Sequence, residues 1–338
     1  MNKEIVEIDG EKIGGNNPLY FIAEGGLNHN GDVKIAKKII ESAKESGASA
    51  IKFQTYTSEK FLAESSEYFQ FFKNVELSIE EFGELKDHAK KMDITFFSAP
   101  FDIESADGLK KLGVPCFKIA SSDLTNIPLV KHIAKMNLPM IISTGLATVE
   151  EINETVDICY KEGNTKISLL HCIANYPTQI EETNLLAINS LKKKFNIPVG
   201  YSDNGESILV DLAAASIGAN IIEKHFTLDK KSLGPDHFFS INPKQLEELI
   251  KNIRLIETMR QGGEKIPQPS EIKNITAIRK SITASKDIKM NEVLTNDNLS
   301  IKRPANGIEP KFLDDVIGKI TKKDIRKDVP IQWDCIQE

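Results

Sequence analysis

The chain has 338 residues, of which 40% are hydrophobic and 27% charged, and its formal net charge is -6. This length allows a full barrel core with a small further domain, and the composition is that of an ordinary globular protein. The negative charge excludes a broad nucleic-acid-binding surface. No apolar run approaches the roughly 20 residues of a membrane-spanning helix, and the N-terminal residues lack the apolar stretch of a secretory signal.

The cysteines are few and scattered, at Cys116, Cys159, Cys172 and Cys335, and none of them forms a CxxC pair. This spacing does not indicate a metal site. We expect reduced thiols in a cytoplasmic protein.

Short β-branched runs alternate with amphipathic helical stretches, which is the pattern of parallel strands with helical crossovers. The predicted strands are Leu19–Ala23, Ala50–Phe53, Thr95–Ser98, Cys116–Ile119, Met140–Ser143, Ile167–His171, Pro198–Tyr201 and Ile221–His225. The predicted helix signals include a helix over Lys34–Ser46, capping boxes at Ser78–Glu81 and Thr148–Glu151, and a cap followed by proline at Asn242-Pro243. Eight strand–helix units favour a closed (β/α)8 TIM barrel over an open sheet.

The pattern changes after the last barrel helix, which ends near Met259. The stretch from Gln261 to Pro269 has two prolines and no helical period, so it indicates a linker. We predict a barrel domain over residues 1–260, a linker over 261–274 and a small, mostly β domain over 275–338. Residues 284–289 resemble residues 321–326, a weak internal repeat that indicates pseudo-symmetry in the last domain.

Polar side chains follow nearly every predicted strand. In a barrel, the residues at the C-terminal strand ends line the active site. Lys52 and Lys118 lie on different predicted strands, and burying two lysines together is unfavourable unless they meet an anion. Ser121, Ser143 and Ser202 add hydroxyl donors, so the set fits a ligand with a carboxylate and a phosphate. Each residue alone is typical of a surface charge or a cap, but their joint placement in one layer favours an active site.

These residues lie in motifs that resemble the sialic acid synthase family, which makes N-acetylneuraminic, legionaminic and pseudaminic acids. The motifs are IAEGGLNHNG, IKFQTY, FKIASSD, IISTGL, HCIANYP, GYSD, IEKHFTLD and GPDH. After the linker, IRKSITASKDI and IKRPANGI resemble the antifreeze-like (SAF) domain of these synthases, a β-clip fold. The resemblance extends from about Pro18 to near the C-terminus.

The resemblance implies a synthase that condenses phosphoenolpyruvate with an N-acetylmannosamine-type 2-acetamido sugar to give a nonulosonic acid and phosphate. In this reaction C3 of the enolpyruvate attacks the sugar aldehyde, water adds at C2, and phosphate leaves with C–O cleavage. The family pattern assigns phosphoenolpyruvate to the two lysines and three serines named above. It assigns the acid/base role to Glu24, which would otherwise be interpreted as a cap of the NHNG turn.

The resemblance also implies contacts with the sugar. Gln54, Tyr176 and Asp236 would hold its hydroxyl groups, and we also place Asp123 and Glu223 in the substrate site. It further implies a domain-swapped homodimer in which Arg303 of one subunit enters the active site of the other, against the N-acyl group. Without the resemblance, Arg303 would be interpreted as a surface residue in a turn.

Members of the family bind a divalent metal, Mn²⁺ or Mg²⁺, through two histidines. His225 matches one of them, but Asn204 stands at the other position, and an amide oxygen is a weaker ligand for a transition metal than imidazole. The metal would act as a Lewis acid on the aldehyde oxygen. Ala99 and Ala174 each remove a donor from the phosphoenolpyruvate site, which weakens binding by roughly 1–2 kcal/mol unless water substitutes.

Three other functions remain open. A related 3-deoxy-ulosonate synthase would use another aldose, but such relatives generally lack the antifreeze-like domain. A carbohydrate-binding or ice-binding protein would not need the lysines, Glu24 and His225. A catalytically altered paralogue is suggested by Asn204, Ala99 and Ala174. The motifs do not identify the acceptor sugar.

Overall fold

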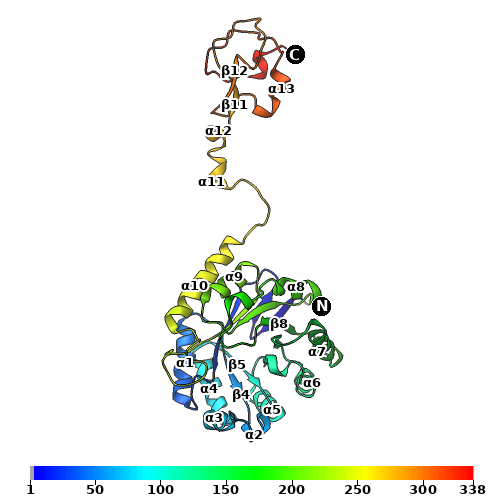
Figure 1. The fold of residues 1–338 in the computed structure, drawn as a ribbon, viewed down its shortest axis with the longest axis vertical. Helices are drawn as coiled ribbons and strands as arrows, with labels where there is room; N and C mark the ends of the chain where they lie inside the picture. Colours follow the sequence, from blue (N-terminus) through cyan, green and yellow to red (C-terminus); the bar gives the residue numbers. More distant parts are fainter. Residues whose placement is uncertain (1–3, 338) are drawn as a thin grey trace. The chain divides into compact units, whose positions relative to one another are not determined.

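The computed structural model describes residues 4–337, and these form two compact units that divide between Gln261 and Gly262. Figure 1 shows the helices and strands of each unit. Among the described residues, no helix is long and apolar enough to cross a membrane.

The first unit is a barrel. In the described chain, eight parallel strands close in the order β10-β3-β4-β5-β6-β7-β8-β9, which confirms the predicted (β/α)8 fold. All eight predicted strands are present, with small shifts at their ends, because strands buried on both faces are nearly continuous apolar runs. The strands are β3 (Tyr20–Gly26), β4 (Ala50–Thr55), β5 (Thr95–Pro100), β6 (Phe117–Ile119), β7 (Met140–Ser143), β8 (Ile167–Cys172), β9 (Val199–Asp203) and β10 (Ile221–His225).

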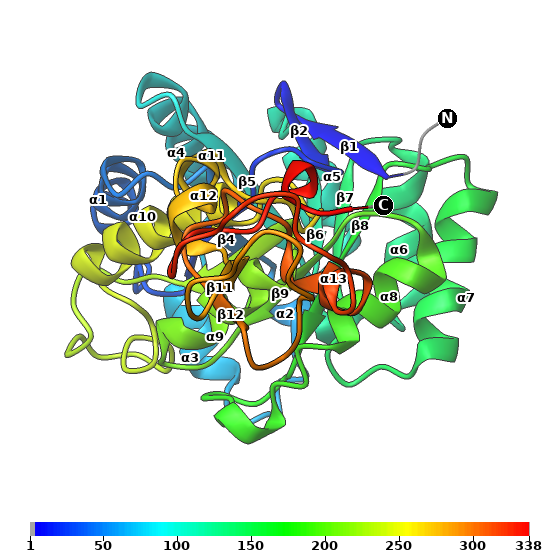
Figure 2. The ribbon, with the colours of Figure 1, turned by 90° about the horizontal axis from the view of Figure 1, so that it is seen from above.

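Helices surround the strands, and Figure 2 shows α1, α10, α6, α7 and α8 around the barrel. Both predicted capping boxes are present, at Ser78 with Glu81 and at Thr148 with Glu151. The long helices are α1 (Val33–Glu45), α4 (Ile79–Lys91), α5 (Ile103–Leu112), α6 (Ile127–Lys135), α7 (Val149–Lys161), α8 (Ala187–Phe195), α9 (Ile208–Ser216) and α10 (Pro243–Met259). Shorter elements are α2 (Ser58–Phe61), α3 (Phe69–Val75), η1 (Ser121–Asp123) and η2 (Ile180–Glu182).

An antiparallel hairpin precedes the barrel, formed by β1 (Ile5–Ile8) and β2 (Glu11–Gly14). Its turn, Asp9-Gly10, has positive φ at both residues (50° and 83°), as two-residue hairpin turns require. The hairpin buries Val6, Ile8 and Ile13 in the barrel core. The sequence analysis did not predict this hairpin.

The second unit has its own apolar core and contains two short antiparallel strands, β11 (Ser281–Ala284) and β12 (Leu299–Lys302). Its helical turns are α11 (Pro269–Ile272), α12 (Ile275–Ile278), η3 (Pro310–Phe312), α13 (Leu313–Val316) and η4 (Trp333–Cys335). The turn α11 lies inside the segment 261–274 that we predicted as a linker.

The two similar segments of the second unit pair with each other. Ile288 and Ile325, which hold the same place in the two copies, exchange backbone hydrogen bonds of 2.8 Å in both directions. The aspartate before each isoleucine caps the opposite copy. Asp287 accepts a hydrogen bond from the N–H of Lys327 at 2.8 Å, and Asp324 accepts one from the N–H of Met290 at 2.8 Å. The weak sequence repeat therefore corresponds to a pseudo-twofold arrangement.

Candidate active site

Charged side chains gather at the carboxyl ends of the barrel strands. Glu24 on β3 is in register with Lys52 on β4 and with His225 on β10. The Glu24 carboxylate forms a buried ion pair with Lys52 at 2.7 Å and accepts a hydrogen bond from the Gln54 amide at 3.2 Å. Burial, together with Glu223, raises the pKa of the Glu24 carboxyl, although Lys52 opposes the shift. Glu24 therefore holds a proton more readily than an exposed glutamate does.

Glu223 lies between the two predicted lysines. Its Oε1 is 3.8 Å from the Lys52 ammonium and 3.7 Å from the Lys118 ammonium, and it accepts a hydrogen bond from Ser202 at 3.1 Å. Burial alone would raise the pKa of Glu223, but Lys118 and Lys52 together lower it. Glu223 is therefore ionised; it neutralises the buried Lys118 and shares Lys52 with Glu24.

The two lysines differ in their titration. Burial opposes the charge of Lys52, but Glu223 and Glu24 outweigh burial and raise its pKa. Burial lowers the pKa of Lys118, and Glu223 only partly offsets it. Lys118 is thus the lysine with the weaker anionic partner, and an added anion would stabilise its charge most.

The ends of β6, β7 and β8 approach one another closely. The Ser121 hydroxyl accepts a hydrogen bond from the N–H of Gly145 at 3.0 Å. A β-carbon on Gly145 would lie 2.7 Å from the Ser121 hydroxyl and 3.2 Å from the Ala174 methyl group, so a larger residue does not fit there. The nearby Ser143 hydroxyl is buried and has no hydrogen-bond partner in the described chain. These contacts place Ser121 and Ser143 on one side of the barrel mouth.

Predicted sugar-binding residues meet on the other side of the mouth. A β-carbon on Gly26 would lie 3.3 Å from Glu24 Oε1, 3.4 Å from Asp236 Oδ2 and 3.6 Å from Gln54 Nε2, so these three polar groups surround one point. The half-exposed Tyr176 ring lies 6.0 Å from the His225 ring and 5.8 Å from the Phe239 ring. The mouth therefore combines a polar group of side chains with an aromatic wall.

A divalent metal at this site would have few protein ligands. Within residues 4–337, no three His, Cys, Asp or Glu side chains are arranged to hold a metal ion. His225 fits as a ligand, since its Nδ1 is buried without a hydrogen bond and lies 3.8 Å from Asp236 Oδ2. The Asn204 amide nitrogen donates to the Ile173 carbonyl at 2.8 Å, which leaves its oxygen for a cation.

Two further predicted site residues are Asp123 and Arg303. The Asp123 carboxylate accepts hydrogen bonds from Ser122 at 3.0 Å and Asn126 at 2.9 Å, and Asn126 is the N-cap of α6, so these contacts stabilise the local turn. Arg303 is exposed and belongs to the second unit.

The sequence analysis missed a clamp between two active-site loops. The buried Asn28 amide donates to the Phe226 carbonyl at 2.9 Å and to the Ser240 hydroxyl at 3.0 Å. It thereby ties the loop after β3 to the loop after β10, which contains Asp236. Asn28 stands in the NHNG motif, but Phe226 and Ser240 lie 198 and 212 residues further along the chain. The motif alone therefore does not reveal these contacts.

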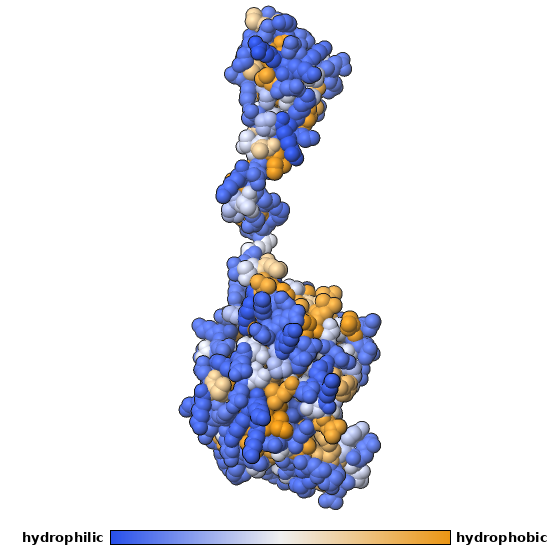
Figure 3. Space-filling model, turned by 90° about the vertical axis from the view of Figure 1, so that its left-hand side faces the viewer, coloured by the Kyte–Doolittle hydropathy of each residue, from blue (hydrophilic) through white to orange (hydrophobic). Residues whose placement is uncertain are grey.

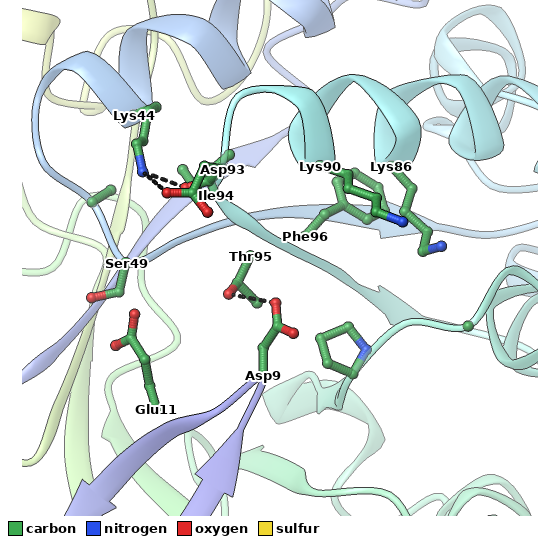
Figure 4. Close-up of a pocket in the computed structure, with 13 residues that line it drawn as sticks. Asp9, Glu11, Lys44, Ser49, Lys86, Lys90, Asp93, Ile94, Thr95 and Phe96 are labelled. Carbon is green, nitrogen blue, oxygen red and sulfur yellow. Dashed lines mark hydrogen bonds and ion pairs between the residues drawn. The ribbon is translucent and has the colours of Figure 1, made fainter.

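A separate pocket of about 540 Å³ lies at the opposite face of the barrel. It is lined by the hairpin turn, by helix ends and by residues at the starts of strands, including Asp9, Thr95 and Lys86 (Figure 4). In Figure 4, Lys44 bonds to Asp93, and Thr95 bonds to Asp9. Active sites of these barrels lie at the C-terminal face, so this pocket is not the candidate site.

A closed (β/α)8 barrel with paired lysines and carboxylates at the carboxyl ends of its strands has the architecture of a barrel enzyme. The NeuB family model matches residues 39–265, and the SAF domain model matches residues 279–337. The chain belongs to the NeuB family, which confirms the resemblance indicated by its motifs. It is a carbon–carbon bond-forming synthase that depends on phosphoenolpyruvate.

Individual relatives agree with this family. The chain is 44% identical over 324 residues to the N,N'-diacetyllegionaminic acid synthase of Campylobacter jejuni, covering 91% of this chain and 97% of that protein. It is 35% identical over 322 residues to a pseudaminic acid synthase of Campylobacter jejuni, covering 91% and 94%. A crystal structure of the N-acetylneuraminic acid synthetase of Leptospira borgpetersenii with citrate matches with a TM-score of 0.78 and 40% identity, covering 81% of this chain and 95% of that one.

Proposed function

We propose that this synthase condenses phosphoenolpyruvate with a 2-acetamido sugar of the N-acetylmannosamine type, giving a nonulosonic acid and phosphate. The main support is the set of buried polar atoms at the mouth that have no hydrogen-bond partner among the described residues: Ser143 Oγ, Glu223 Oε2 and His225 Nδ1. Buried polar groups are normally paired, so these atoms are suited to contact a polar ligand.

Phosphoenolpyruvate would bind on the side of Lys52, Lys118, Ser121, Ser143 and Ser202. Glu223 now faces both lysines, and a phosphate or carboxylate of the ligand would share them with it. Charge-assisted hydrogen bonds from lysine to such oxygens are the stronger kind, which favours a doubly anionic ligand over a neutral one.

The sugar would bind on the side of Gln54, Tyr176 and Asp236, next to Glu24. Attack of enolpyruvate C3 on the aldehyde carbon converts the aldehyde oxygen to a hydroxyl group, which must gain a proton. Glu24 is suited to supply it, because burial raises the pKa of its carboxyl group, so it takes up a proton more readily than an exposed glutamate does. Water then adds at C2, and the C–O bond to phosphate breaks.

A divalent cation would be held by His225, with oxygen atoms of Asn204 or Asp236 completing its protein ligands. It would supply Lewis-acid polarisation of the aldehyde oxygen when bound. Mg²⁺ accepts oxygen ligands readily, so a site with one histidine favours it over Mn²⁺.

The assembly would be a domain-swapped homodimer, in which Arg303 of the partner subunit reaches the acyl group of the sugar. The loops at the barrel mouth expose large apolar side chains that a partner could cover: Leu146, Ile180, Leu186, Leu209, Leu233 and Phe238. Figure 3 shows apolar patches on the surface of the barrel unit, and large exposed patches commonly mark interaction surfaces. We expect this assembly in the cytoplasm.

A screen of acceptor sugars tests this function. Purified protein should release phosphate from phosphoenolpyruvate only when an acceptor is present. N-acetylmannosamine, its 6-phosphate and 2,4-diacetamido-6-deoxy sugars should each be tried with EDTA, Mg²⁺ or Mn²⁺. The aromatic wall beside Asp236 suits acetamido and deoxy groups, so we expect the diacetamido-deoxy sugar to be preferred. No release with any acceptor would contradict the proposal and favour a catalytically altered paralogue, whereas release with a simple aldose would favour the related ulosonate synthases.

A further inference from the structure

A second buried ionic cluster lies outside the set of residues described above. Lys224 on β10 forms ion pairs with Asp203 on β9 and, at 3.3 Å, with Asp211 on α9, and all three side chains are 0% exposed. Side chains alternate along a strand. Glu223 faces the interior lysines, so Lys224 faces outward, where its contact with α9 places it between the strands and the helix.

Lys224 also binds the backbone of the loop between β9 and α9, residues 204–207. Its ammonium donates to the carbonyls of Gly205 at 2.7 Å and Ser207 at 3.2 Å. Asp203, its ion-pair partner, accepts a hydrogen bond from the N–H of Gly205 at 2.8 Å. One buried ammonium therefore holds both the start and the end of this loop.

The same loop and strand end carry active-site residues. Asp203 lies between Ser202 and Asn204, and the ladder pairs Ser202 with Glu223 and Asp203 with Lys224. The inner pair, Ser202 and Glu223, is joined by a hydrogen bond of 3.1 Å. The ion pair between Lys224 and Asp203 thus fixes the register of β9 and β10 at the point where Glu223 approaches the two active-site lysines.

Stability alone does not account for such a cluster. Replacing a buried ion pair with apolar residues of similar volume is often neutral or stabilising. The Lys224 ammonium has four oxygen partners, which come from the end of β9, the loop 204–207 and α9. Such a group is suited to fixing the path of the loop.

We propose that Lys224 is a positioning residue for the synthase reaction. It holds the end of β9 and the loop 204–207 so that Ser202 and Asn204 face the ligand. Lys224 does not contact the substrate itself. This inference rests on the function proposed above, because it assigns ligand contacts to Ser202 and Asn204.

The test compares two lysine-to-methionine variants of the same region. Lys224→Met removes the ammonium and keeps most of the volume. Lys192→Met is the control, since Lys192 donates to the Gly218 carbonyl at the other end of the strands, before β10 begins. We expect Lys224→Met to raise the KM for phosphoenolpyruvate or lower kcat by about 10- to 100-fold, because a shift of about 1 Å in a group that contacts the ligand can cost about 100-fold. Lys192→Met should leave both constants near the wild-type values, and Lys224→Arg should recover part of the loss.

A purely structural role gives a different result. If Lys224→Met lowers only the melting temperature, and kcat and KM per folded molecule are unchanged, the proposal is wrong. Should Lys224→Met fail to fold, Asp211→Asn weakens a single contact of the ammonium and should shift the same constants in the same direction. Unchanged constants in Asp211→Asn would then overturn it.

Hydrogen exchange gives a readout that does not depend on turnover. Amide protons of residues 204–207 should exchange faster in Lys224→Met or Asp211→Asn than in wild type or Lys192→Met. If the wild-type protein releases no phosphate with any acceptor, the proposed function fails. The exchange rates then decide whether Lys224 holds the loop, and equal rates in all variants would contradict that.

Discussion

Removing the Lys118 ammonium gives a quantitative test of the phosphoenolpyruvate site. In Lys118→Ala, the ligand loses a buried cation that now lies 3.7 Å from a carboxylate oxygen of Glu223. At this 3.7 Å separation and an effective dielectric constant near 20, two unit charges attract by about 4 kcal/mol. If a ligand oxygen takes a similar position, this energy corresponds to a loss of about 1,000-fold in kcat/KM.

The same substitution also affects folding. In Lys118→Ala, Lys52, at 3.8 Å, is the remaining ion-pair partner of Glu223, so the buried Glu223 carboxylate is less well neutralised. Breaking a buried pair costs about 3 kcal/mol or more when no other cation remains, and Lys52 reduces that cost here. A double variant, Lys118→Ala with Glu223→Gln, should recover the melting temperature. It should not recover activity, because the ligand still lacks its cation.

The assay is phosphate release at saturating acceptor, with phosphoenolpyruvate varied and the folded fraction measured by circular dichroism. Lys192→Ala serves as the control for losing a partly buried lysine. A decrease in kcat/KM of less than about tenfold, which is about 1.4 kcal/mol, would show that Lys118 does not contact the phosphate or carboxylate. Recovery of activity in the double variant would likewise refute the assignment, since it would trace the defect to Glu223.

Three further predictions concern other residues. Burial lowers the pKa of His29 from 6.5 to about 4, so the unfolded chain binds a proton that the native chain does not between these values. The free energy of unfolding should therefore fall by up to about 3 kcal/mol as the pH drops from 6.5 to below 4. In urea unfolding, His29→Asn should make the free energy of unfolding depend less on pH. An unchanged dependence on pH would exclude His29 as its source. Arg303→Ala mixed with Lys118→Ala should regain activity that neither variant has alone, and absence of complementation after subunit exchange would argue against a swapped dimer. Asn204→His should tighten Mn²⁺ binding measured by electron paramagnetic resonance, and unaltered affinity would place the metal away from this position.

The strand order and the mouth residues could be predicted because their signals are local. Nearly every barrel strand is an apolar run with a polar residue at or near its carboxyl end, so Glu24 and Lys52 could be placed at the mouth from the sequence. The hairpin at the N-terminus was missed, because its segment is mostly polar and only Val6, Ile8 and Ile13 enter the core.

Contacts that depend on register could not be predicted. Side-chain alternation along the predicted strand places Glu223 and Lys224 on opposite faces. The sequence does not show that Asp211 of α9 is the partner of Lys224. Likewise, the motif that predicts a substrate contact for Asp123 does not show that its carboxylate accepts hydrogen bonds from Ser122 and Asn126. A side chain near a strand end can cap a turn as readily as it can face a ligand.

The paired copies in the second unit have a consequence for protein synthesis. The reciprocal aspartate caps join residues 34 and 40 positions apart, so each copy supplies contacts that the other copy lacks. Closing a loop of this length loses chain entropy before any contact compensates for it. A nascent chain that has reached only Ile288 therefore lacks the segment around Ile325 with which Ile288 exchanges backbone hydrogen bonds. Ala284 and Ile288 of the first copy lack their core neighbours Ile325 and Ile336 until these residues have left the ribosome.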